Sequence, residues 1–261
     1  MKNRYQSISD EDISVIANKF YDEKQHLTEF QEKPKAIFVA GQPGAGKTKA
    51  ANLVKAELKE LGGYLPVDAD RMREELPTGG IVYPSEQTQA DAGKLVEVLR
   101  ARLIKERRNF FEEGTFRNSE AVKQSMSYLK SQGYQIEMIA VAANFEQSLS
   151  GIFERYEGQI AMGSKSPRLV PVDYHQQAFD GFTKTFQEAA DLFDRVRVIN
   201  RDGQEIFDSQ KSANTQTAYG ALLSGRKMNI QDWQEVQSTW DYVIESAKQR
   251  GNAREQYMAD I

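Results

Sequence analysis

The sequence predicts an α/β fold: a doubly wound, mostly parallel sheet flanked by helices, with an extra C-terminal helical segment. Two observations support this fold class. Short apolar runs alternate with longer helical patterns along most of the 261 residues, and a glycine-rich segment follows directly on the first apolar run, as at the turn from a parallel strand into its helix. We expect one domain over residues 1–209, including an N-terminal helix, and a helical extension over residues 210–261 packed on it.

The expected strands are short apolar runs without the alternation of a half-exposed strand, as is typical of buried parallel strands. These runs are Lys35–Ala40, Tyr64–Val67, Asn109–Phe111 and Ile136–Ala143. Two further runs, Arg195–Asn200 and Glu205–Asp208, flank Arg201-Asp202-Gly203 and predict a tight hairpin.

The expected helices have apolar residues spaced three and four apart. Their ranges are Glu11–Phe30, Lys47–Leu61, Arg71–Glu75, Glu86–Arg108, Ser119–Gln132, Asp173–Phe193 and Gln231–Arg250. Glycines at positions 62–63, 133 and 251 are typical C-terminal stops. The phenylalanines of the 173–193 helix share one stripe, which predicts a place in the core.

The composition excludes several classes of protein. The chain has no cysteine, so disulfides, thiolate metal sites and cysteine nucleophiles are absent. Met1–Asp12 carries no apolar signal-peptide core, and no apolar run approaches the roughly 18 residues that a membrane span requires. We therefore expect a cytoplasmic globular protein that does not bind membranes.

Charge argues against a general nucleic-acid binder, because the formal net charge is −4. The stretch from Arg100 to Arg108 is basic and makes a nucleic-acid kinase conceivable. It is better interpreted as the solvated face of a helix whose apolar side carries Leu95, Leu99 and Leu103. We therefore expect no nucleic-acid partner.

The glycine-rich segment Gly41-Gln42-Pro43-Gly44-Ala45-Gly46-Lys47-Thr48 has the spacing of a P-loop. Its glycines permit backbone turns that aim N–H groups at phosphate oxygens, next to the positive N-terminus of the following helix. Lys47 is expected to reach the β- and γ-phosphates of ATP, and the Thr48 hydroxyl to bind Mg²⁺. The segment predicts a P-loop kinase-like domain that binds ATP.

Carboxylates follow the second and third expected strands. In a doubly wound sheet ligands bind beyond the carboxyl ends of the strands, so Asp68 and Glu113 are expected near the phosphates. A carboxylate there can accept a hydroxyl proton as general base, or support the metal. Asp70 is expected instead to cap the Arg71–Glu75 helix, a role also open to Asp68. Glu112 alternates with Glu113, so one of the two should point away from the site.

Two arginines follow the fourth expected strand. Arg155 lies in a short helical stretch that ends before Gly158, and Arg168 lies beyond the flexible segment after it. Surface arginines are usually solvated. In a P-loop kinase, however, a helix–loop–helix lid brings guanidinium groups onto the transferring phosphate, where they neutralise developing charge.

Taken in order, these motifs resemble the zeta toxin family, the kinase toxins of epsilon/zeta-type toxin–antitoxin systems. The resemblance runs from about Lys35 to Ser209. It rests on the P-loop, Asp68-Ala69-Asp70, Glu113-Gly114-Thr115, Glu154-Arg155-Tyr156-Glu157 and Asn200-Arg201-Asp202-Gly203.

This resemblance implies a function and a set of roles. The family's activity is phosphorylation of the 3′-hydroxyl of UDP-N-acetylglucosamine with ATP and Mg²⁺, which blocks cell-wall synthesis. By position, Lys47 and Thr48 match the phosphate and metal residues, and Asp68 matches the general base. Glu113 and Thr115 match the residues at the substrate end of the third strand. Arg155 and Arg168 match the arginines that grip the ATP phosphates. The resemblance also implies a separate antitoxin protein that obstructs the ATP site.

Two alternative functions stay open. A related P-loop kinase acting on the hydroxyl of a nucleoside, a dinucleotide or an antibiotic would use the same base and lid. A nucleotide-dependent ATPase switch would hydrolyse ATP without an acceptor and tolerate loss of Asp68. The two histidines, His26 and His175, are isolated in the sequence and suggest neither a metal site nor a catalytic triad.

Overall fold

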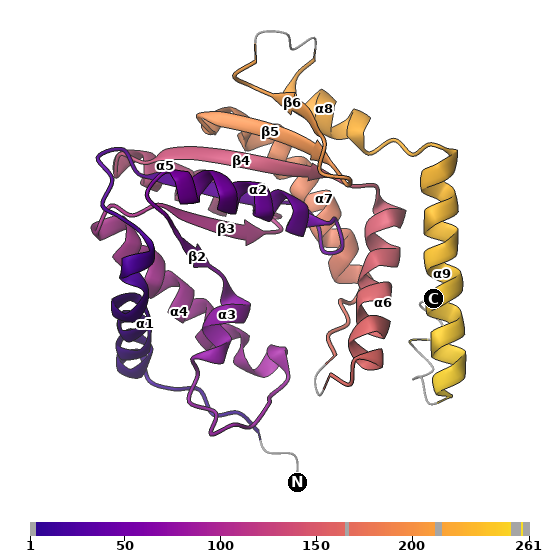
Figure 1. The fold of residues 1–261 in the computed structure, drawn as a ribbon, viewed down its shortest axis with the longest axis horizontal. Helices are drawn as coiled ribbons and strands as arrows, with labels where there is room; N and C mark the ends of the chain where they lie inside the picture. The colour runs from indigo at the N-terminus through magenta and orange to yellow at the C-terminus, as the bar shows by residue number, and fades with distance from the viewer. Residues whose placement is uncertain (1–3, 165–166, 212–215, 252–256, 258–261) are drawn as a thin grey trace. The chain divides into compact units, whose positions relative to one another are not determined.

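A computed structural model describes residues 4–164, 167–211, 216–251 and residue 257. The described residues form a mostly parallel six-stranded sheet flanked by helices, in the order β2-β3-β1-β4-β5-β6 (Figure 1). β2 pairs with β3 in parallel, and β5 pairs with β6 in an antiparallel hairpin. The strands are β1 (Lys35–Ala40), β2 (Leu65–Val67), β3 (Phe110–Gly114), β4 (Gln135–Ala142), β5 (Arg195–Asn200) and β6 (Glu205–Asp208). The predicted fold class is confirmed.

Helices and short 3-10 turns connect the strands. They are α1 (Asp10–Lys24), η1 (Gln25–Leu27), α2 (Lys47–Glu60), α3 (Ala69–Glu74), α4 (Ser85–Lys105), α5 (Ser119–Ser131), α6 (Phe145–Ala161), α7 (Val172–Ala189), η2 (Ala190–Leu192), α8 (Ala218–Gly225) and α9 (Ile230–Arg250). The N-terminal helix is shorter than predicted, because it ends at Lys24. The helix that carries Arg155 is longer than predicted, because α6 runs through Gly158, and α8 was not predicted.

The chain divides into two units. The first comprises residues 1–38, 51–113 and 125–137, and the second comprises residues 39–50, 114–124 and 138–261. In the first unit α1 and α3 both pack on α4. The apolar side of α4 is fully buried, with Leu95, Leu99 and Leu103 at 0% exposure, as predicted.

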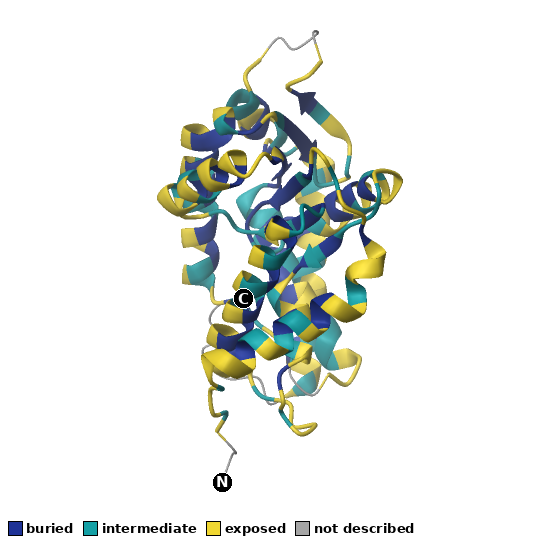
Figure 2. Cartoon of the chain, turned by 90° about the vertical axis from the view of Figure 1, so that its left-hand side faces the viewer, coloured by how far each residue is buried: buried dark blue, intermediate teal, exposed yellow. Residues whose placement is uncertain are grey.

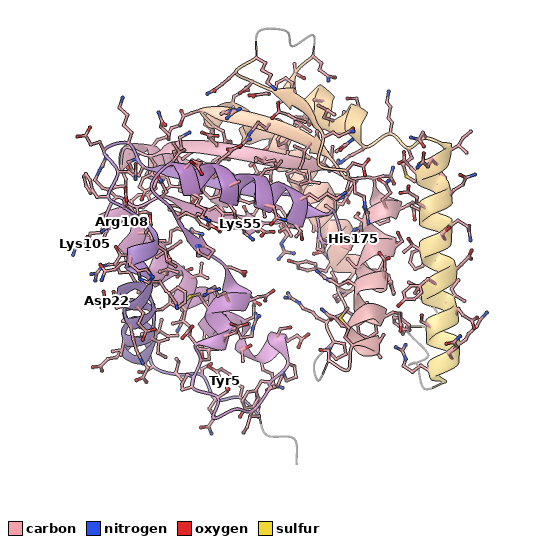
Figure 3. The ribbon with its side chains drawn as sticks, viewed as in Figure 1. Tyr5, Asp22, Lys55, Lys105, Arg108 and His175 are labelled. Carbon is pink, nitrogen blue, oxygen red and sulfur yellow. The ribbon has the colours of Figure 1, made fainter. Side chains whose placement is uncertain are left out.

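The basic stretch from Arg100 to Arg108 is a solvated face only in part: Lys105 is exposed as expected, whereas the arginines are half-buried and make polar contacts. Arg100 donates to both oxygens of Glu112, at 2.6 and 2.5 Å. Arg102 lies 3.7 Å from Asp22, and Arg108 Nη1 donates to the Thr28 carbonyl at 2.9 Å (Figure 3 labels Asp22 and Arg108). These contacts connect α4 and the residues after it to α1, to β3 and to the segment that follows η1.

In the second unit α9 packs on α6. Phe153 and Ile152 of α6 form a buried cluster with Val243 and Ala247 of α9. Buried residues line the strands and the inner faces of the helices (Figure 2). Phe182, Phe186 and Phe193 are buried as predicted, and Phe179 is half-buried.

Arg250 at the end of α9, and Tyr257 beyond it, make polar contacts with α6. Arg250 Nη1 donates to Glu157 Oε2 at 2.8 Å, and the hydroxyl of Tyr257 bonds the same carboxylate. The boundary drawn at residue 209 stays a prediction. Within the part of the chain that the structure describes, no helix is long and apolar enough to cross a membrane.

Candidate nucleotide-binding site

The P-loop lies in the second unit, between β1 and α2. Gly44 and Gly46 have φ angles of 77° and 87°, a left-handed backbone that side chains disfavour. A Cβ on Gly44 would approach the carbonyl oxygen of Ser148 in α6 to 2.0 Å. Only glycine therefore fits at this position, and the loop lies against the backbone of α6.

Lys47 begins α2 and folds back over the loop. Its Nζ donates to the carbonyls of Gly41 at 2.9 Å and Gln42 at 3.1 Å. Thr48 follows in the first helical turn, and its side chain is exposed. An ammonium held over the loop can exchange these carbonyl contacts for stronger bonds to phosphate oxygens.

A buried network of hydrogen bonds connects the P-loop to neighbouring elements. Gln42 is fully buried, and its Nε2 donates to the Ala143 carbonyl at 3.0 Å and to Ser148 Oγ at 3.1 Å. Ser148 Oγ lies 2.9 Å from Nε2 of His175 in α7 (labelled in Figure 3). Burial lowers the pKa of His175 to about 4, so the ring is neutral near pH 7. The network ties the P-loop to α6 and α7.

Arg201 adds a cation beside the P-loop. It lies in the turn between β5 and β6, and its Nη1 donates to the Gln147 carbonyl of α6. A Cβ on Gly46 would come within 3.6 Å of Arg201 Cγ. Burial lowers the pKa of the guanidinium, which nevertheless stays charged at neutral pH. The sequence marked Arg201 as part of a hairpin turn and of the family motif, but not as a residue of the nucleotide site.

His175 and Ser148 were also missed by sequence reasoning. No motif contains them, since a histidine and a serine on two helices meet only through the packing of α6 and α7. Spacing along the chain carries no signal for such a contact. The burial of Gln42, at 0% exposure, is likewise a property of the fold and not of the motif.

The end of β3 approaches the P-loop within the second unit. The backbone N–H of Gly41 donates to the Gly114 carbonyl at 3.3 Å. Thr115, the next residue, is therefore held near the start of the loop.

Arg155 and Arg168, the two arginines predicted to lie on a lid, also belong to the second unit. Arg155 lies on α6 and is exposed. The backbone N–H of Arg168 donates to Gln159 Oε1 at 2.7 Å, and Gln159 stands one turn along α6 from Arg155. The segment before α7 is thus attached to the helix that carries Arg155. Residues 165–166 of the expected loop lie outside the described residues.

The carboxylates at the strand ends belong to the first unit. The parallel register pairs Val67 with Glu112, so Asp68 and Glu113 follow at the same level of β2 and β3. Burial raises the pKa of Glu112, although the adjacent Arg100 opposes that shift. Glu112 faces α4, and Glu113 points to the opposite face by alternation.

Asp68, and not Asp70, is the N-cap of α3, so the predicted capping role of Asp70 is wrong. Asp68 Oδ1 accepts from the backbone N–H of Asp70 at 2.8 Å, because the helix begins two residues earlier than predicted. Asp70 lies in the first turn and pairs with Arg73. The second oxygen of Asp68 makes no hydrogen bond within the described part of the chain, and the side chain is exposed. It is therefore available to accept a proton.

The described residues contain no cluster of three or more histidines and carboxylates able to hold a metal. The donor at the P-loop is the single exposed hydroxyl of Thr48. Mg²⁺ characteristically keeps several waters and binds through few protein groups together with substrate phosphates. This donor set therefore fits a Mg²⁺ that arrives with a nucleotide.

The profile of the family described as "Zeta toxin" matches residues 18–212, which include the P-loop, Asp68, Glu113, Arg155, Arg168 and Arg201. The chain belongs to the zeta toxin family. Among similar zeta-type proteins, Toxin PezT of Streptococcus pneumoniae serotype 4 is 28% identical over 215 residues, covering 79% of this chain and 82% of that protein. Toxin zeta of Enterococcus hirae is 25% identical over 207 residues, covering 75% and 72%.

Solved structures share the fold. A structure from the PezAT chromosomal toxin–antitoxin system of Streptococcus pneumoniae matches with a TM-score of 0.79 and 23% identity, covering 92% of this chain and 98% of that one. A chain of the AvrRxo1-ORF1:-ORF2 structure with ATP matches with a TM-score of 0.58 and 16% identity, covering 79% and 73%. At these identities the likeness concerns the fold.

Proposed function

We propose that this zeta toxin family member is an ATP-dependent phosphotransferase. The observation that carries the proposal is the P-loop: left-handed glycines, Lys47 folded over the loop, and α2 beginning directly behind it. Such a loop binds a triphosphate through backbone N–H groups and the helix N-terminus. The structural likeness to a chain solved with ATP supports the choice of nucleotide.

In the proposed reaction, Lys47 and the loop N–H groups hold the phosphates of ATP. Thr48 would hold Mg²⁺, which when bound neutralises charge on the phosphate oxygens. Arg155 and Arg168 stabilise the charge that develops on the transferring phosphoryl group, because a guanidinium fork matches phosphate geometry.

Asp68 is proposed as the general base. Its carboxylate takes the proton of the acceptor hydroxyl while the hydroxyl oxygen bonds to the γ-phosphorus of ATP. The bond from the γ-phosphorus to the bridging oxygen breaks, and ADP leaves. Glu113 and Thr115 are proposed to position the acceptor. Asp68 and Glu113 directly follow the paired residues Val67 and Glu112 of the neighbouring strands β2 and β3, and this placement supports the assignment.

The proposed acceptor is the 3′-hydroxyl of UDP-N-acetylglucosamine. Membership of the zeta toxin family supports this substrate. The cytoplasm is the proposed place of the reaction. Its phosphorylation would block cell-wall synthesis and make the chain the toxin of a toxin–antitoxin pair. The likeness to a chain of the PezAT toxin–antitoxin system supports a separate antitoxin protein as partner.

Mass spectrometry of the purified protein with Mg-ATP and UDP-N-acetylglucosamine tests this function. We expect a product heavier by one phosphate, which is absent with Lys47→Ala and with Asp68→Ala. Lys105→Gln, a change at an exposed lysine of α4, is the matched control and should leave the product unchanged.

A metabolite extract incubated in parallel separates the alternatives. If UDP-N-acetylglucosamine stays unmodified while a nucleoside, dinucleotide or antibiotic gains a phosphate, the chain is a kinase of a different acceptor. ATP hydrolysis that needs no acceptor and survives Asp68→Ala would identify an ATPase switch and contradict the proposal.

A further inference from the structure

A cavity that the proposed phosphotransferase site does not use lies wholly within the first unit. It has a volume of about 500 Å³ and is lined by residues of α1, η1, α2, β2 and α3. Its apolar floor includes Phe20 and Leu65, which are 2% and 1% exposed, together with the aromatic ring of Tyr64. Cavities that bind small ligands have volumes of about 300–1,000 Å³ and are mostly apolar. We call this cavity the cationic pocket.

Four cations line the cationic pocket, and no carboxylate does. They are Lys24, Lys55, Lys59 and Arg71. Across the described part of the chain, none of the four forms an ion pair, whereas Lys94 and Arg100 of the same unit pair with carboxylates at 2.6 and 2.5 Å. Four unneutralised charges around a low-dielectric floor attract anions.

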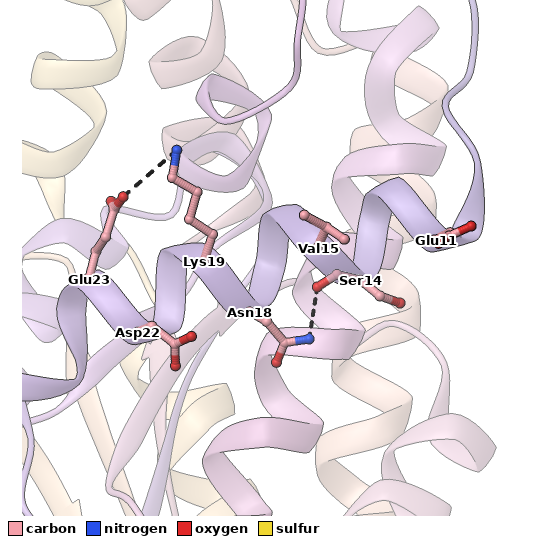
Figure 4. Close-up of a pocket in the computed structure, with 7 residues that line it drawn as sticks. All are labelled: Glu11, Ser14, Val15, Asn18, Lys19, Asp22 and Glu23. Carbon is pink, nitrogen blue, oxygen red and sulfur yellow. Dashed lines mark hydrogen bonds and ion pairs between the residues drawn. The ribbon is translucent and has the colours of Figure 1, made fainter.

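A different surface of the same unit shows the contrast. The hollow along α1 is lined by Glu11, Ser14, Val15, Asn18, Lys19, Asp22 and Glu23 (Figure 4). Here acidic residues outnumber the single lysine, and that lysine lies 3.9 Å from Glu23. The only cation that lines this hollow is therefore paired with a carboxylate, in contrast to the four cations of the cationic pocket.

Aromatic rings hold two of the cations in place. Lys55 Nζ lies 5.5 Å from the ring centroid of Phe111, and the guanidinium of Arg71 lies 5.7 Å from that of Phe20. Figure 3 labels Lys55, which projects from α2. A cation over a ring face keeps its N–H groups available, so both remain competent donors. The Phe111 ring in turn packs edge-on against Tyr64, at 5.6 Å between centroids.

Backbone packing builds one wall of the cationic pocket. Gly63 has a φ of 79°, and a Cβ there would approach the Leu27 carbonyl oxygen to 2.0 Å. An antiparallel bridge joins Gly63 to Thr28. Glycine thus lets η1 and the end of α2 meet closely, and the wall exists without a ligand.

From this arrangement we propose that the cationic pocket binds a small amphipathic anion: a flat apolar body that carries a carboxylate or phosphate group. The body rests on Phe20, Tyr64 and Leu65, and the anionic group lies between the lysines and Arg71. Tyr64 also lines the pocket, and its neutral hydroxyl can donate a hydrogen bond. This site does not depend on the proposed phosphotransferase activity.

Titration calorimetry with 1-naphthoate and its neutral isostere 1-naphthamide tests the site. We expect one naphthoate per chain and binding of naphthamide about tenfold weaker or worse, because a charged hydrogen bond is lost. The double variant Lys55→Gln/Arg71→Gln should weaken naphthoate by about tenfold or more and leave naphthamide nearly unchanged. Lys55→Arg, which keeps the charge, should retain most of the affinity.

Two control variants locate the bound anion. Lys105→Gln removes an exposed lysine outside the pocket and should leave naphthoate binding unchanged. Lys47→Ala should also bind normally, since loss of binding there would assign the anion to the P-loop. Equal binding of the charged and neutral probes, or equal binding by wild type and the double variant with unchanged thermal unfolding, would overturn the proposal.

Discussion

The P-loop and the strand-end carboxylates are built in different ways. The P-loop is fixed by left-handed glycines and by a buried network of Gln42, Ser148 and His175. The carboxylates of Asp68 and Glu113 are exposed at the ends of two strands, and one cap hydrogen bond holds Asp68. The donor half of the proposed site is thus specified by backbone and core, and the acceptor half by a few surface side chains.

We expect the two halves of the proposed site to differ in how well they tolerate amino-acid substitutions. Buried polar groups and backbone contacts resist substitution because each loss leaves an unsatisfied group or a clash. Exposed carboxylates can be exchanged at little cost to the fold, so the acceptor half can change chemistry while the donor half stays fixed. Four substitutions, in order of decreasing effect, test this contrast.

Asp68→Asn should have the largest effect on activity. Asparagine keeps the N-cap of α3 but cannot accept the hydroxyl proton, so kcat should fall by about 10²–10⁴-fold with little change in stability. Steady-state kinetics and thermal unfolding measure the two quantities separately. A variant that keeps its activity would show that Asp68 only caps the helix.

Gly44→Ala should have the largest effect on stability. The added Cβ meets a backbone oxygen 2.0 Å away, and the φ of 77° adds strain, so we expect a loss of about 2–4 kcal/mol and weakened ATP binding. Gly80→Ala is the matched control: its φ is 81°, but nothing lies within 4 Å of a Cβ there. Denaturant titration of both separates clash from φ strain. Equal losses would contradict the close contact with α6.

Ser148→Ala should have a moderate effect on both stability and ATP binding. It leaves the buried Gln42 amide and His175 without their shared partner, at a cost of about 1–3 kcal/mol, and it loosens the loop, so the KM for ATP should rise. Ser150→Ala is the control, because Ser150 is a buried serine of the same helix whose hydroxyl, among the residues that the structure describes, bonds only the Gln147 carbonyl within α6. If both variants bind ATP like wild type, the network does not position the loop.

The smallest effect concerns pH. The folded pKa of His175 is about 4, below the ordinary value of about 6.5, so the unfolded chain binds more protons between these values. The contribution of His175 to stability should be complete above pH 6.5 and be lost as the pH falls toward 4. Comparing unfolding free energies of wild type and His175→Gln over this range measures it. Parallel pH profiles would contradict a buried neutral ring.

Much of the fold was predictable from local patterns. The limits of β1 match the predicted strand, and the glycine spacing marked the P-loop, because both are set by neighbouring residues. α8 was missed because its small residues follow a polar stretch with no clear periodicity. β3 was predicted too short, because two charged residues, Glu112 and Glu113, follow its apolar run. Glu112 fits in the strand because it pairs with Arg100.

The candidate site was predictable only in part. Motif spacing pointed to Lys47, Asp68 and Arg155, but it gave no sign of His175 or of the packing of Arg201 beside Gly46. Those contacts join residues far apart in sequence. The start of α3 was also misplaced, because two aspartates two residues apart are equally good caps by composition.

Phosphorus NMR of ATP incubated with the protein, Mg²⁺ and UDP-N-acetylglucosamine separates phosphoryl transfer to the sugar nucleotide from simple ATP hydrolysis. A phosphotransferase converts the γ-phosphate signal into one phosphomonoester signal, with ADP formed in equal amount and no product with Lys47→Ala. Release of inorganic phosphate alone, with or without the sugar nucleotide, would identify an ATPase and contradict phosphoryl transfer to the sugar nucleotide.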